Sequence, residues 1–321
     1  MRAPSFWSHG GLAPALLAPA AWAYDLAGRI ERGTTRPERV AAPVICVGNI
    51  VAGGAGKTPV AIAIAKRLAA RHRHPHFVTR GYGGSAAGPL HVDRARHDAR
   101  TVGDEPLLLA RAAPTWVSRD RAGGARAAIT AGADVIVMDD GLQNNSLVKD
   151  LTLVVVDGGY GFGNGRVMPA GPLRESIEAG LARADAVVFV GADAAGATRD
   201  VAGRKPIIPA RLVPGAGAED LFNRDVVAFA GIGRPQKFFD TLTEIGARVV
   251  LAESFADHHP YTADEVMRLV ETAAAREAIV VTTEKDAVRL PPEAQPMVKV
   301  LAVELQWGDP HQIDALLAKL S

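Results

Sequence analysis

Cysteine is almost absent from this sequence, and charge of neither sign dominates it. The 321 residues include one cysteine, Cys46, so a disulfide framework is excluded and a reducing compartment is indicated. Cys46 lies in an apolar run and is expected to be a small buried hydrophobe. The 36 Lys and Arg nearly balance the 35 Asp and Glu, which argues against nucleic acid as a partner.

Long apolar runs are also missing, apart from a short one at the N-terminus. Residues 11–24 are apolar, but they fall short of the roughly 20 residues that a spanning helix needs, and Pro14 and Pro19 interrupt them. Trp7, Trp22 and Tyr24 would suit a headgroup region. We expect a helix that lies in a membrane interface, with a helix packed on the core as the alternative.

The rest of the chain predicts two α/β units. At about 100–200 residues per domain, the length suggests two domains. From residue 43 onward, short apolar runs alternate with helical stretches, which is typical of a mostly parallel sheet flanked by helices. The expected divisions are residues 1–28 as the membrane-associating helix, 29–205 as the main α/β domain and 206–321 as a smaller C-terminal α/β domain.

Two sets of strands support this division. The first set comprises residues 44–50, 76–79, 115–118, 134–138, 151–156 and 187–190. The second comprises residues 207–212, 226–230, 248–252, 278–282 and 298–303. Helices are expected at 59–71, from about 104, and at 122–131, 235–245, 263–276 and 311–320.

A glycine-rich segment between the first strand and the first helix predicts a phosphate loop. Its glycines let backbone N–H groups converge on phosphate oxygens, and the helix N-terminus favours an anion. Lys57 would reach the outer phosphates and Thr58 would hold Mg²⁺. The standard pattern has glycine where this chain has Val51, so the loop is a variant. The predicted ATP-binding residues are Val51, Ala52, Gly53, Gly54, Ala55, Gly56, Lys57 and Thr58.

An acidic pair at a strand end supplies the partner that a phosphate loop requires for Mg²⁺. Asp139 and Asp140 follow the apolar residues 135–138, at the end of a strand where open α/β sheets bind ligands. Asp157, which follows residues 154–156, is a second candidate. Either acid could instead cap a helix or solvate a turn.

Further motifs occur in a fixed order along the chain. They are residues 47–59, 80–83, Val102-Gly103-Asp104-Glu105-Pro106, Asp139-Asp140-Gly141-Leu142-Gln143, residues 163–165, residues 169–175, residues 229–235, Asp257-His258-His259 and residues 282–288. Together they resemble the tetraacyldisaccharide 4'-kinase family over residues 5–300. The family also carries an apolar helix before its phosphate loop.

The resemblance implies a reaction and a location. The family transfers the γ-phosphoryl of ATP to the 4'-hydroxyl of an acylated glucosamine disaccharide 1-phosphate, forming lipid IVA in lipid A biosynthesis. It acts at the cytoplasmic face of the bacterial inner membrane. Its fold is two α/β/α domains joined by a hinge, with nucleotide in the cleft over which the smaller domain closes. We expect a monomer.

The resemblance also implies roles for single residues. Asp104 matches the proposed general base, and His258 matches a histidine that would pair with it from the second domain when the domains close. Glu105 would lie near the metal with Thr58, Asp139 and Asp140. The predicted catalytic residues are therefore Asp104, His258 and Lys57.

Other positions leave the interpretation more open. Arg80 and Arg174 lie in Gly- and Pro-rich loops and could hold substrate phosphate or the charge of ATP. Asn144 stands where the family usually has histidine, so no catalytic role is assigned to it. Residues 283–286 resemble a guanine-reading motif, but Lys285 and Asp286 are adjacent, which argues against GTP; the segment is expected to line the nucleotide cleft.

Two other classes of protein share part of this pattern. An ATP-dependent ligase or carboxylase also carries Gly-Lys-Thr and paired acids, but it does not need the apolar N-terminal helix. A membrane-associated switch NTPase would need a guanine motif at the correct spacing, which this chain lacks. A lipid kinase should partition to membranes and lose that behaviour when residues 1–28 are deleted, whereas a ligase should not.

Overall fold

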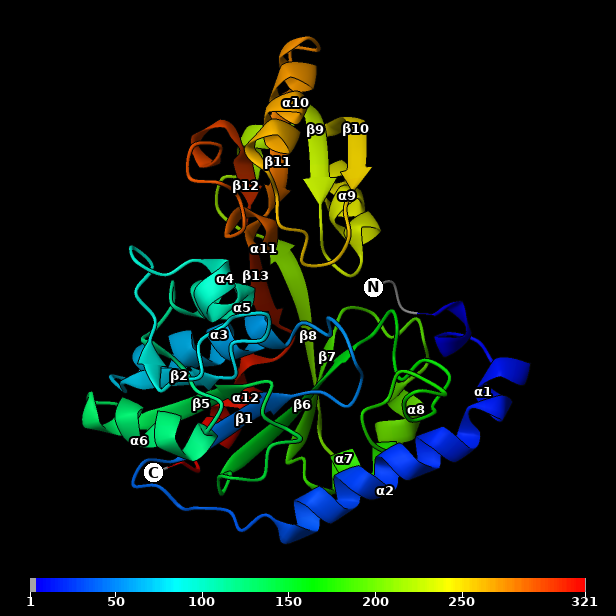
Figure 1. The fold of residues 1–321 in the computed structure, drawn as a ribbon, viewed down its shortest axis with the longest axis vertical. Helices are drawn as coiled ribbons and strands as arrows, with labels where there is room; N and C mark the ends of the chain where they lie inside the picture. Colours follow the sequence, from blue (N-terminus) through cyan, green and yellow to red (C-terminus); the bar gives the residue numbers. More distant parts are fainter. Residues whose placement is uncertain (1–3, 321) are drawn as a thin grey trace.

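The structure is a computed structural model that describes residues 4–320. Two sheets of different size lie one above the other (Figure 1). The larger sheet has nine strands in the order β13-β8-β7-β6-β1-β5-β2-β4-β3, and the smaller has four in the order β10-β9-β11-β12. The strands of the larger sheet are β1 (Val44–Gly48), β2 (Pro75–Thr79), β3 (Leu90–His91), β4 (Thr115–Val117), β5 (Val135–Asp139), β6 (Leu151–Asp157), β7 (Ala186–Val190), β8 (Ile207–Pro214) and β13 (Val303–Trp307).

Helices cover both faces of the larger sheet. Alternate residues of one strand point to opposite faces, so Ile45 packs with α3 (Lys57–Ala69) and α12 (Pro310–Leu317), while Val44 packs with α6 (Arg121–Thr130). On this second face, α7 (Ile177–Ala182) packs against β6 and β7. Burial on both faces explains the continuous apolar strands, and Cys46 is buried as expected.

The smaller sheet is parallel and is also covered on both faces. Its strands are β9 (Asp225–Ala230), β10 (Arg248–Ser254), β11 (Ile279–Thr283) and β12 (Lys299–Leu301). Helix α9 (Pro235–Glu244) buries Phe238, Phe239 and Leu242 on one face. Helix α10 (Ala263–Ala274) buries Val266 and Leu269 on the other. The predicted mixed α/β fold with a mostly parallel sheet is therefore confirmed.

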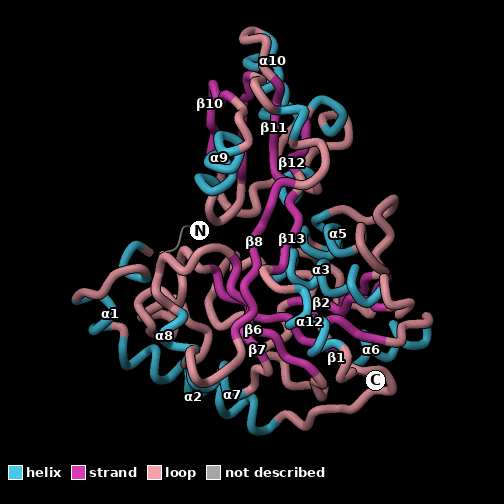
Figure 2. Tube along the Cα trace, turned by 180° about the vertical axis from the view of Figure 1, so that it is seen from behind, coloured by secondary structure: helices cyan, strands magenta, loops and turns pink. Residues whose placement is uncertain are grey.

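The division of the chain between the sheets differs from the predicted boundary at residue 206. Strand β8 continues the larger sheet beside β7, and β13 returns antiparallel along β8 (Figure 2). The predicted strand 298–303 is accordingly two elements, β12 in the smaller sheet and β13 in the larger one. Helix α12 then packs on the larger sheet, because its apolar side chains Ile313 and Leu317 complete the core formed with α3. The smaller domain is therefore an insertion between β8 and β13.

The N-terminal segment forms two helices, α1 (Leu12–Leu16) and α2 (Ala18–Thr34), which lie along one side of the larger domain (Figure 1). The predicted boundary after residue 28 falls inside α2. The apolar run ends at residue 24 but the helix continues to Thr34, and within it Arg29 pairs with Asp25 one turn earlier at 2.8 Å. Residues 1–3 of the predicted segment and residue 321 lie outside the described part. Within residues 4–320, no helix combines the length and hydropathy needed to cross a bilayer.

The remaining helices are short. They are α4 (Ala99–Val102), α5 (Asp104–Leu109), α8 (Thr198–Val201) and α11 (Glu284–Ala287). Helices α5 and α11 contact each other although they belong to different domains, which brings the start of α5 close to the smaller domain.

Candidate active site

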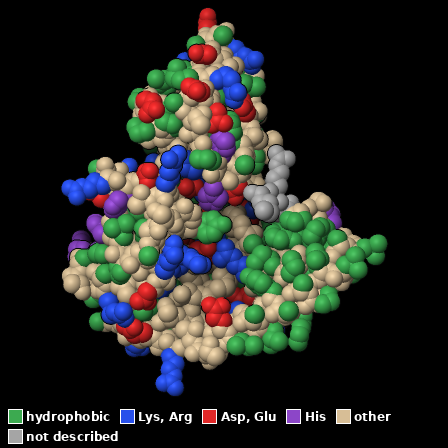
Figure 3. All heavy atoms as spheres, in the orientation of Figure 1, with side chains coloured by type: hydrophobic (Ala, Val, Ile, Leu, Met, Phe, Trp, Pro, Cys, Tyr) green, Lys and Arg blue, Asp and Glu red, His purple; other side chains and the backbone are tan. Residues whose placement is uncertain are grey.

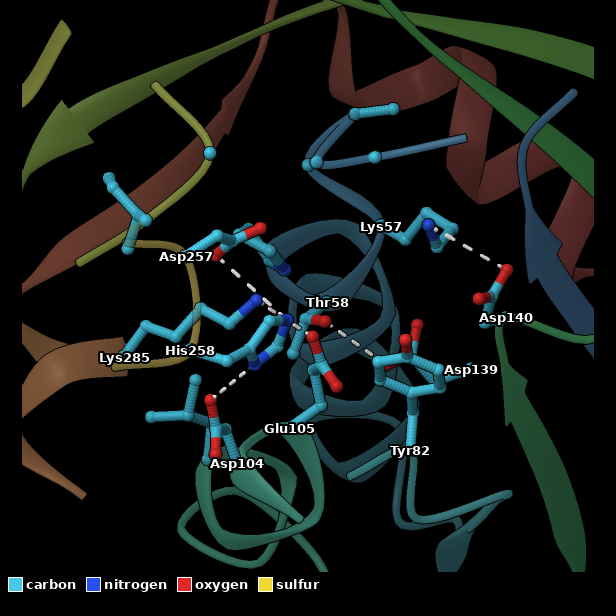
Figure 4. Close-up of a pocket in the computed structure, with 18 of the residues that line it drawn as sticks. Lys57, Thr58, Tyr82, Asp104, Glu105, Asp139, Asp140, Asp257, His258 and Lys285 are labelled. Carbon is cyan, nitrogen blue, oxygen red and sulfur yellow. Dashed lines mark hydrogen bonds and ion pairs between the residues drawn. The ribbon is translucent and has the colours of Figure 1, made fainter. Parts of the chain in front are cut away.

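A cleft of about 3170 Å³ runs between the two domains, and residues of both domains line it. In the space-filling view, basic side chains gather where the smaller domain meets the larger one (Figure 3). All eight residues of the predicted phosphate loop border this cleft, as do Asp104, Asp139 and His258. The sequence motifs of the two domains therefore meet in one place (Figure 4).

The glycine loop, residues 49–56, joins β1 to α3 at the edge of the cleft. Gly53 has φ 115° and Gly56 has φ 85°, conformations that favour glycine. A Cβ at Gly53 or Gly54 would meet no atom within 4 Å, so the backbone there is open to a ligand. Lys57, the first residue of α3, donates a hydrogen bond to Asn49 Oδ1 at 3.2 Å and lies 3.6 Å from Asp140 Oδ1.

Val51, the departure from the standard loop pattern, has a structural role. It forms an isolated antiparallel bridge with Leu173, and the next residue, Ala52, donates its N–H to Pro172 O at 2.8 Å. The Val51 side chain packs with Leu173 in the core. The start of the loop is therefore fixed to residues 172–174, and Arg174 is carried to the cleft beside it.

The adjacent carboxylates Asp139 and Asp140 have different surroundings. Asp139 is 2% exposed; its Oδ2 accepts a hydrogen bond from Thr58 Oγ1 at 3.0 Å, and its buried Oδ1 has no partner among residues 4–320. Burial raises the pKa of Asp139 to about 7. Asp140 turns away with φ 56°, and its Oδ1 accepts a hydrogen bond from Arg174 Nη1 at 2.9 Å. Although burial opposes it, Lys57 and Arg174 hold the pKa of Asp140 below its ordinary value.

The structure gathers only part of the predicted metal set. Thr58 and Asp139 share a hydrogen bond, whereas Asp140 is occupied by two cations of the same domain. Glu105 pairs with Lys285 Nζ of the smaller domain at 2.9 Å. In the described chain, no three His, Cys, Asp or Glu side chains are grouped to hold a metal ion. Nearby cations hold the carboxylates of Glu105 and Asp140, and the metal role of these two residues stays a prediction.

Asp104 and His258 meet across the cleft, as the resemblance implied. Asp104 begins α5 after Gly103, and its Oδ2 lies 2.8 Å from His258 Nδ1 (Figure 4). His258 has φ 60°, in the loop after β10, and its backbone N–H donates to Gly231 O at 3.1 Å. Its ring lies 5.9 Å from the ring of Tyr82, which is exposed. The two domains are already in contact at this point.

The two predicted substrate arginines differ. Arg174 bridges Asp140 and the Gln143 side-chain oxygen, the latter at 3.3 Å, so it is committed within the larger domain. Arg80 is exposed at the cleft and pairs with no acid among the residues that the structure describes. Arg121 lies near Arg80. Burial, and to a smaller extent the positive charge of Arg80, lowers the pKa of Arg121 to about 10.

Sequence reasoning missed two basic residues of the smaller domain. Arg234 Nη2 lies 2.8 Å from Asp157 Oδ2 and donates to Gly54 O at 3.2 Å, and Lys237 lies 3.5 Å from the same carboxylate. Arg234 belongs to the motif at residues 229–235, so the sequence marked this position, but the motif did not indicate what the side chain does. Asp157, the second candidate for a metal ligand, is taken up by this contact.

Gln143 and Asn144 have local roles. Gln143 Nε2 donates to Asn49 O at 3.0 Å and to the buried Glu175 at 2.9 Å, which ties the acidic loop to the glycine loop. Asn144 Oδ1 accepts hydrogen bonds from the backbone and hydroxyl of Ser146. The missing family histidine is thus replaced by a residue that shapes a turn.

An open α/β sheet with a glycine loop, a lysine and an acidic strand end at one edge is the arrangement of phosphoryl-transferring enzymes. The chain is such an enzyme by class, and its family follows from comparison. A sequence model of the tetraacyldisaccharide-1-P 4'-kinase family, LpxK, matches residues 13–321, and the chain belongs to this family. The resemblance of its motifs is thereby confirmed.

Individual relatives agree. A tetraacyldisaccharide 4'-kinase of Paramagnetospirillum magneticum is 55% identical over 100% of this chain and 99% of the relative. One of Rhodospirillum centenum is 54% identical over 100% and 97%. The crystal structure of an apo-form LpxK from Aquifex aeolicus in complex with ATP has a TM-score of 0.76 and 25% identity, covering 96% of this chain and 99% of that one. Membership of this kinase family decides against the ligase and the switch NTPase.

Proposed function

We propose that this protein transfers the γ-phosphoryl of ATP to the 4'-hydroxyl of tetraacyldisaccharide 1-phosphate and thereby forms lipid IVA. The observation that carries the proposal is the Asp104–His258 pair, which spans the two domains in the same cleft as the glycine loop. A carboxylate in that position can accept a proton while the loop holds phosphate. Both requirements of a kinase are present in one cavity.

The glycine loop is proposed to bind the ATP phosphates. The open backbone at Gly53 and Gly54 and the N-terminus of α3 favour an anion, and Lys57 lies at the start of that helix. Lys57 is then free to exchange its contact with Asn49 and Asp140 for a phosphate oxygen. Arg234 of the smaller domain already donates a hydrogen bond to Gly54 O of the loop, so it would cover the loop on the side of the smaller domain.

The residues present fit a magnesium ion at Thr58 and Asp139. The buried Asp139 Oδ1 lacks a partner in the described chain, and a carboxylate and a hydroxyl are oxygen donors of the kind that Mg²⁺ takes beside substrate phosphates and water. Bound there, Mg²⁺ would neutralise charge on the transferring phosphate. Thr58 and Asp139 would hold it, whereas Asp140 would keep Lys57 and Arg174 in place.

Asp104 is proposed to accept the proton of the sugar hydroxyl. As that proton moves to the carboxylate, the hydroxyl oxygen forms a bond to the γ-phosphorus and the bond to the ADP oxygen breaks. His258 orients the carboxylate through Oδ2. Arg80, exposed at the cleft, is proposed to contact phosphate of the acceptor.

Helices α1 and α2 are proposed to lie on the cytoplasmic face of the inner membrane. Apolar side chains gather over this side of the molecule (Figure 3). Leu12 is 84% exposed, Leu16 is 81% exposed and Trp22 is 69% exposed, an arrangement that a lipid surface would cover.

Flotation with anionic phospholipid vesicles tests this membrane contact. The triple variant Leu12→Ser, Leu16→Ser, Trp22→Ser should no longer float with the vesicles. The matched control, Phe222→Ser with Met297→Ser in the smaller domain, should still float.

The reaction itself is tested by transfer of label from γ-³²P-ATP to tetraacyldisaccharide 1-phosphate in detergent. Wild type should label the lipid, and Asp104→Ala should lower kcat by roughly a hundredfold or more. If wild type hydrolyses ATP without labelling the lipid, the proposed acceptor is wrong.

The protein is proposed to be a monomer, and light scattering of the same preparation should give the mass of a monomer.

A further inference from the structure

The segment of residues 284–289, which comprises α11 and the turn after it, contacts the larger domain through three ion pairs, two to α5 and one to Arg111, which follows α5. The sequence predicted only that residues 283–286 line the cleft. The three pairs are Glu284 Oε1 with Arg111 Nη1 at 3.1 Å, Lys285 Nζ with Glu105 Oε1 at 2.9 Å, and Arg289 Nε with Asp104 Oδ2 at 3.3 Å.

Arg289 is the most buried cation of this segment, with its side chain 4% exposed. Its Nη1 donates to His259 O at 3.3 Å, and its Nη2 donates to Gly231 O at 3.0 Å. Its Nε also donates to Lys285 O at 3.1 Å. One planar guanidinium therefore joins α11 to the two loops that follow β9 and β10, a geometry that a lysine ammonium cannot reproduce.

The position of Arg289 is fixed from within the smaller domain. Asp286 is fully buried, and its Oδ1 accepts hydrogen bonds from Arg289 Nη2 at 2.7 Å, Tyr261 OH at 2.7 Å and Gly231 N at 2.8 Å. Because these partners belong to one domain, the guanidinium is held in place independently of α5. Its positive charge faces the larger domain, with Nε 3.3 Å from Asp104 Oδ2.

The two oxygens of Asp104 are consequently unlike. Oδ2 lies within hydrogen-bond distance of His258 Nδ1, at 2.8 Å, and forms an ion pair with Arg289, whose Nε is 3.3 Å away. No hydrogen bond reaches Oδ1 from any residue between 4 and 320. Because the imidazole and the guanidinium both lie against Oδ2, they favour one orientation of the carboxylate and leave its other oxygen for a ligand.

We propose that Arg289 is a positioning residue of the phosphoryl transfer. It fixes the loop that carries His258, and it turns Asp104 so that Oδ1 receives the hydroxyl proton of the acceptor. His258 and Arg289 both hold Gly231 O, through the backbone N–H of the one and Nη2 of the other, so the loop and the guanidinium move together. This inference rests on the proposed role of Asp104 as the proton acceptor.

The test compares the label transfer of wild type, Arg289→Met, Arg289→Lys and the control Arg276→Met. Arg276 is exposed, lies in the same domain and likewise donates to a carbonyl, Val250 O. We expect kcat of Arg289→Met and Arg289→Lys to fall by about 10–100-fold while KM for ATP changes less than about threefold. Arg276→Met should match wild type.

A purely structural role would not move the pH profile. The charged groups facing Asp104 are His258, Arg289 and Lys285. Removal of the guanidinium should shift the acid limb of kcat to higher pH in Arg289→Met, but less in Arg289→Lys, which keeps a cation. If Arg289→Met unfolds because Asp286 loses its partner, Arg289→Met with Asp286→Asn removes both charges and gives the same comparison.

The outcomes separate this inference from the proposed function. If folded Arg289→Met retains kcat within about twofold of wild type with an unshifted acid limb, the positioning role is overturned although the kinase assignment stands. If wild type labels no lipid, the proposed acceptor fails first. If Arg289→Met loses kcat and its acid limb moves as expected, the positioning role is supported.

Discussion

Two pairs of adjacent carboxylates border the same cleft, and they differ in which domain supplies their hydrogen-bond and ion-pair partners. Asp139 and Asp140 end β5 and are bound by Thr58, Lys57 and Arg174 of their own domain. Asp104 and Glu105 begin α5 and are bound by His258, Arg289 and Lys285 of the other domain. The first pair is assembled by folding of the larger domain alone, whereas the second is complete only when the smaller domain is seated on it.

This difference separates two tasks of a kinase. The phosphate side of the cleft can be formed in advance, because its donors are fixed to one sheet. The acceptor side depends on the apposition of two domains, so its geometry can be made or lost with the movement of the smaller domain. Variants of the two pairs should therefore fail in different ways.

The largest effect is expected at the interdomain pair. Asp104→Asn keeps the shape of the side chain but removes the proton acceptor, so kcat should fall by about 10²–10⁴-fold. Nucleotide affinity should stay within about threefold of wild type, because the glycine loop is untouched. Label transfer gives the first value, and equilibrium titration with a fluorescent ATP analogue gives the second. Loss of nucleotide affinity in this variant would show that the two sides of the cleft are not separate.

A large effect on stability is expected at the intradomain pair. The pKa of Asp139 is raised from 3.8 to about 7, so its protonated form stabilises the fold below pH 4, and that contribution is lost as pH rises through about 7. Asp139→Asn should therefore increase the free energy of unfolding by roughly 2–4 kcal/mol at pH 8 and by much less at pH 5.

Thermal unfolding of the metal-free protein at both pH values measures this effect. Asp157→Asn is the control, because that carboxylate is held by Arg234 and Lys237 and ends β6 of the same sheet. It should not become more stable at pH 8. An Asp139→Asn protein whose stability at pH 8 equals that of wild type would contradict the raised pKa.

A smaller effect is expected at Arg174, which supports the intradomain pair. Without its guanidinium, Asp140 retains Lys57 as its cation, and Lys57 is less available to the ATP phosphates. Arg174→Met should lower kcat/KM for ATP by about tenfold, the size of one charge-assisted hydrogen bond. Arg166→Met on the same loop is the control, since Arg166 is exposed. If both variants had the same kcat/KM for ATP, Arg174 would have no role in the site.

The smallest effect is expected at the outermost interdomain ion pair. Arg111→Glu opposes Glu284 and should lower kcat by about two- to fivefold, because partly exposed pairs contribute up to about 1 kcal/mol. The exchange Arg111→Glu with Glu284→Arg restores opposite charges and should recover most of the loss. Kinetics of the two single variants and the double variant measure the coupling. Purely additive losses would show that this pair does not seat the smaller domain.

The sequence alone was sufficient for most of the strands and for the family. Apolar runs set the strands within a few residues, since burial on both faces of a sheet leaves a local signature. The ordered motifs identified the family, and they named Asp104 and His258, which the structure brings within 2.8 Å. The glycine loop was readable because its conformation demands glycine locally.

What only the tertiary structure decided is how charges and strands pair over long separations in the chain. Glu105, which was expected beside a metal, forms an ion pair with Lys285. Strand β13, which follows β12, returns to the larger sheet and pairs with β8. A carboxylate binds whichever cation the fold brings within reach, and an edge strand pairs with whichever neighbour is open. Neither choice leaves a local pattern, so Arg289 could be connected to Asp104 only in three dimensions.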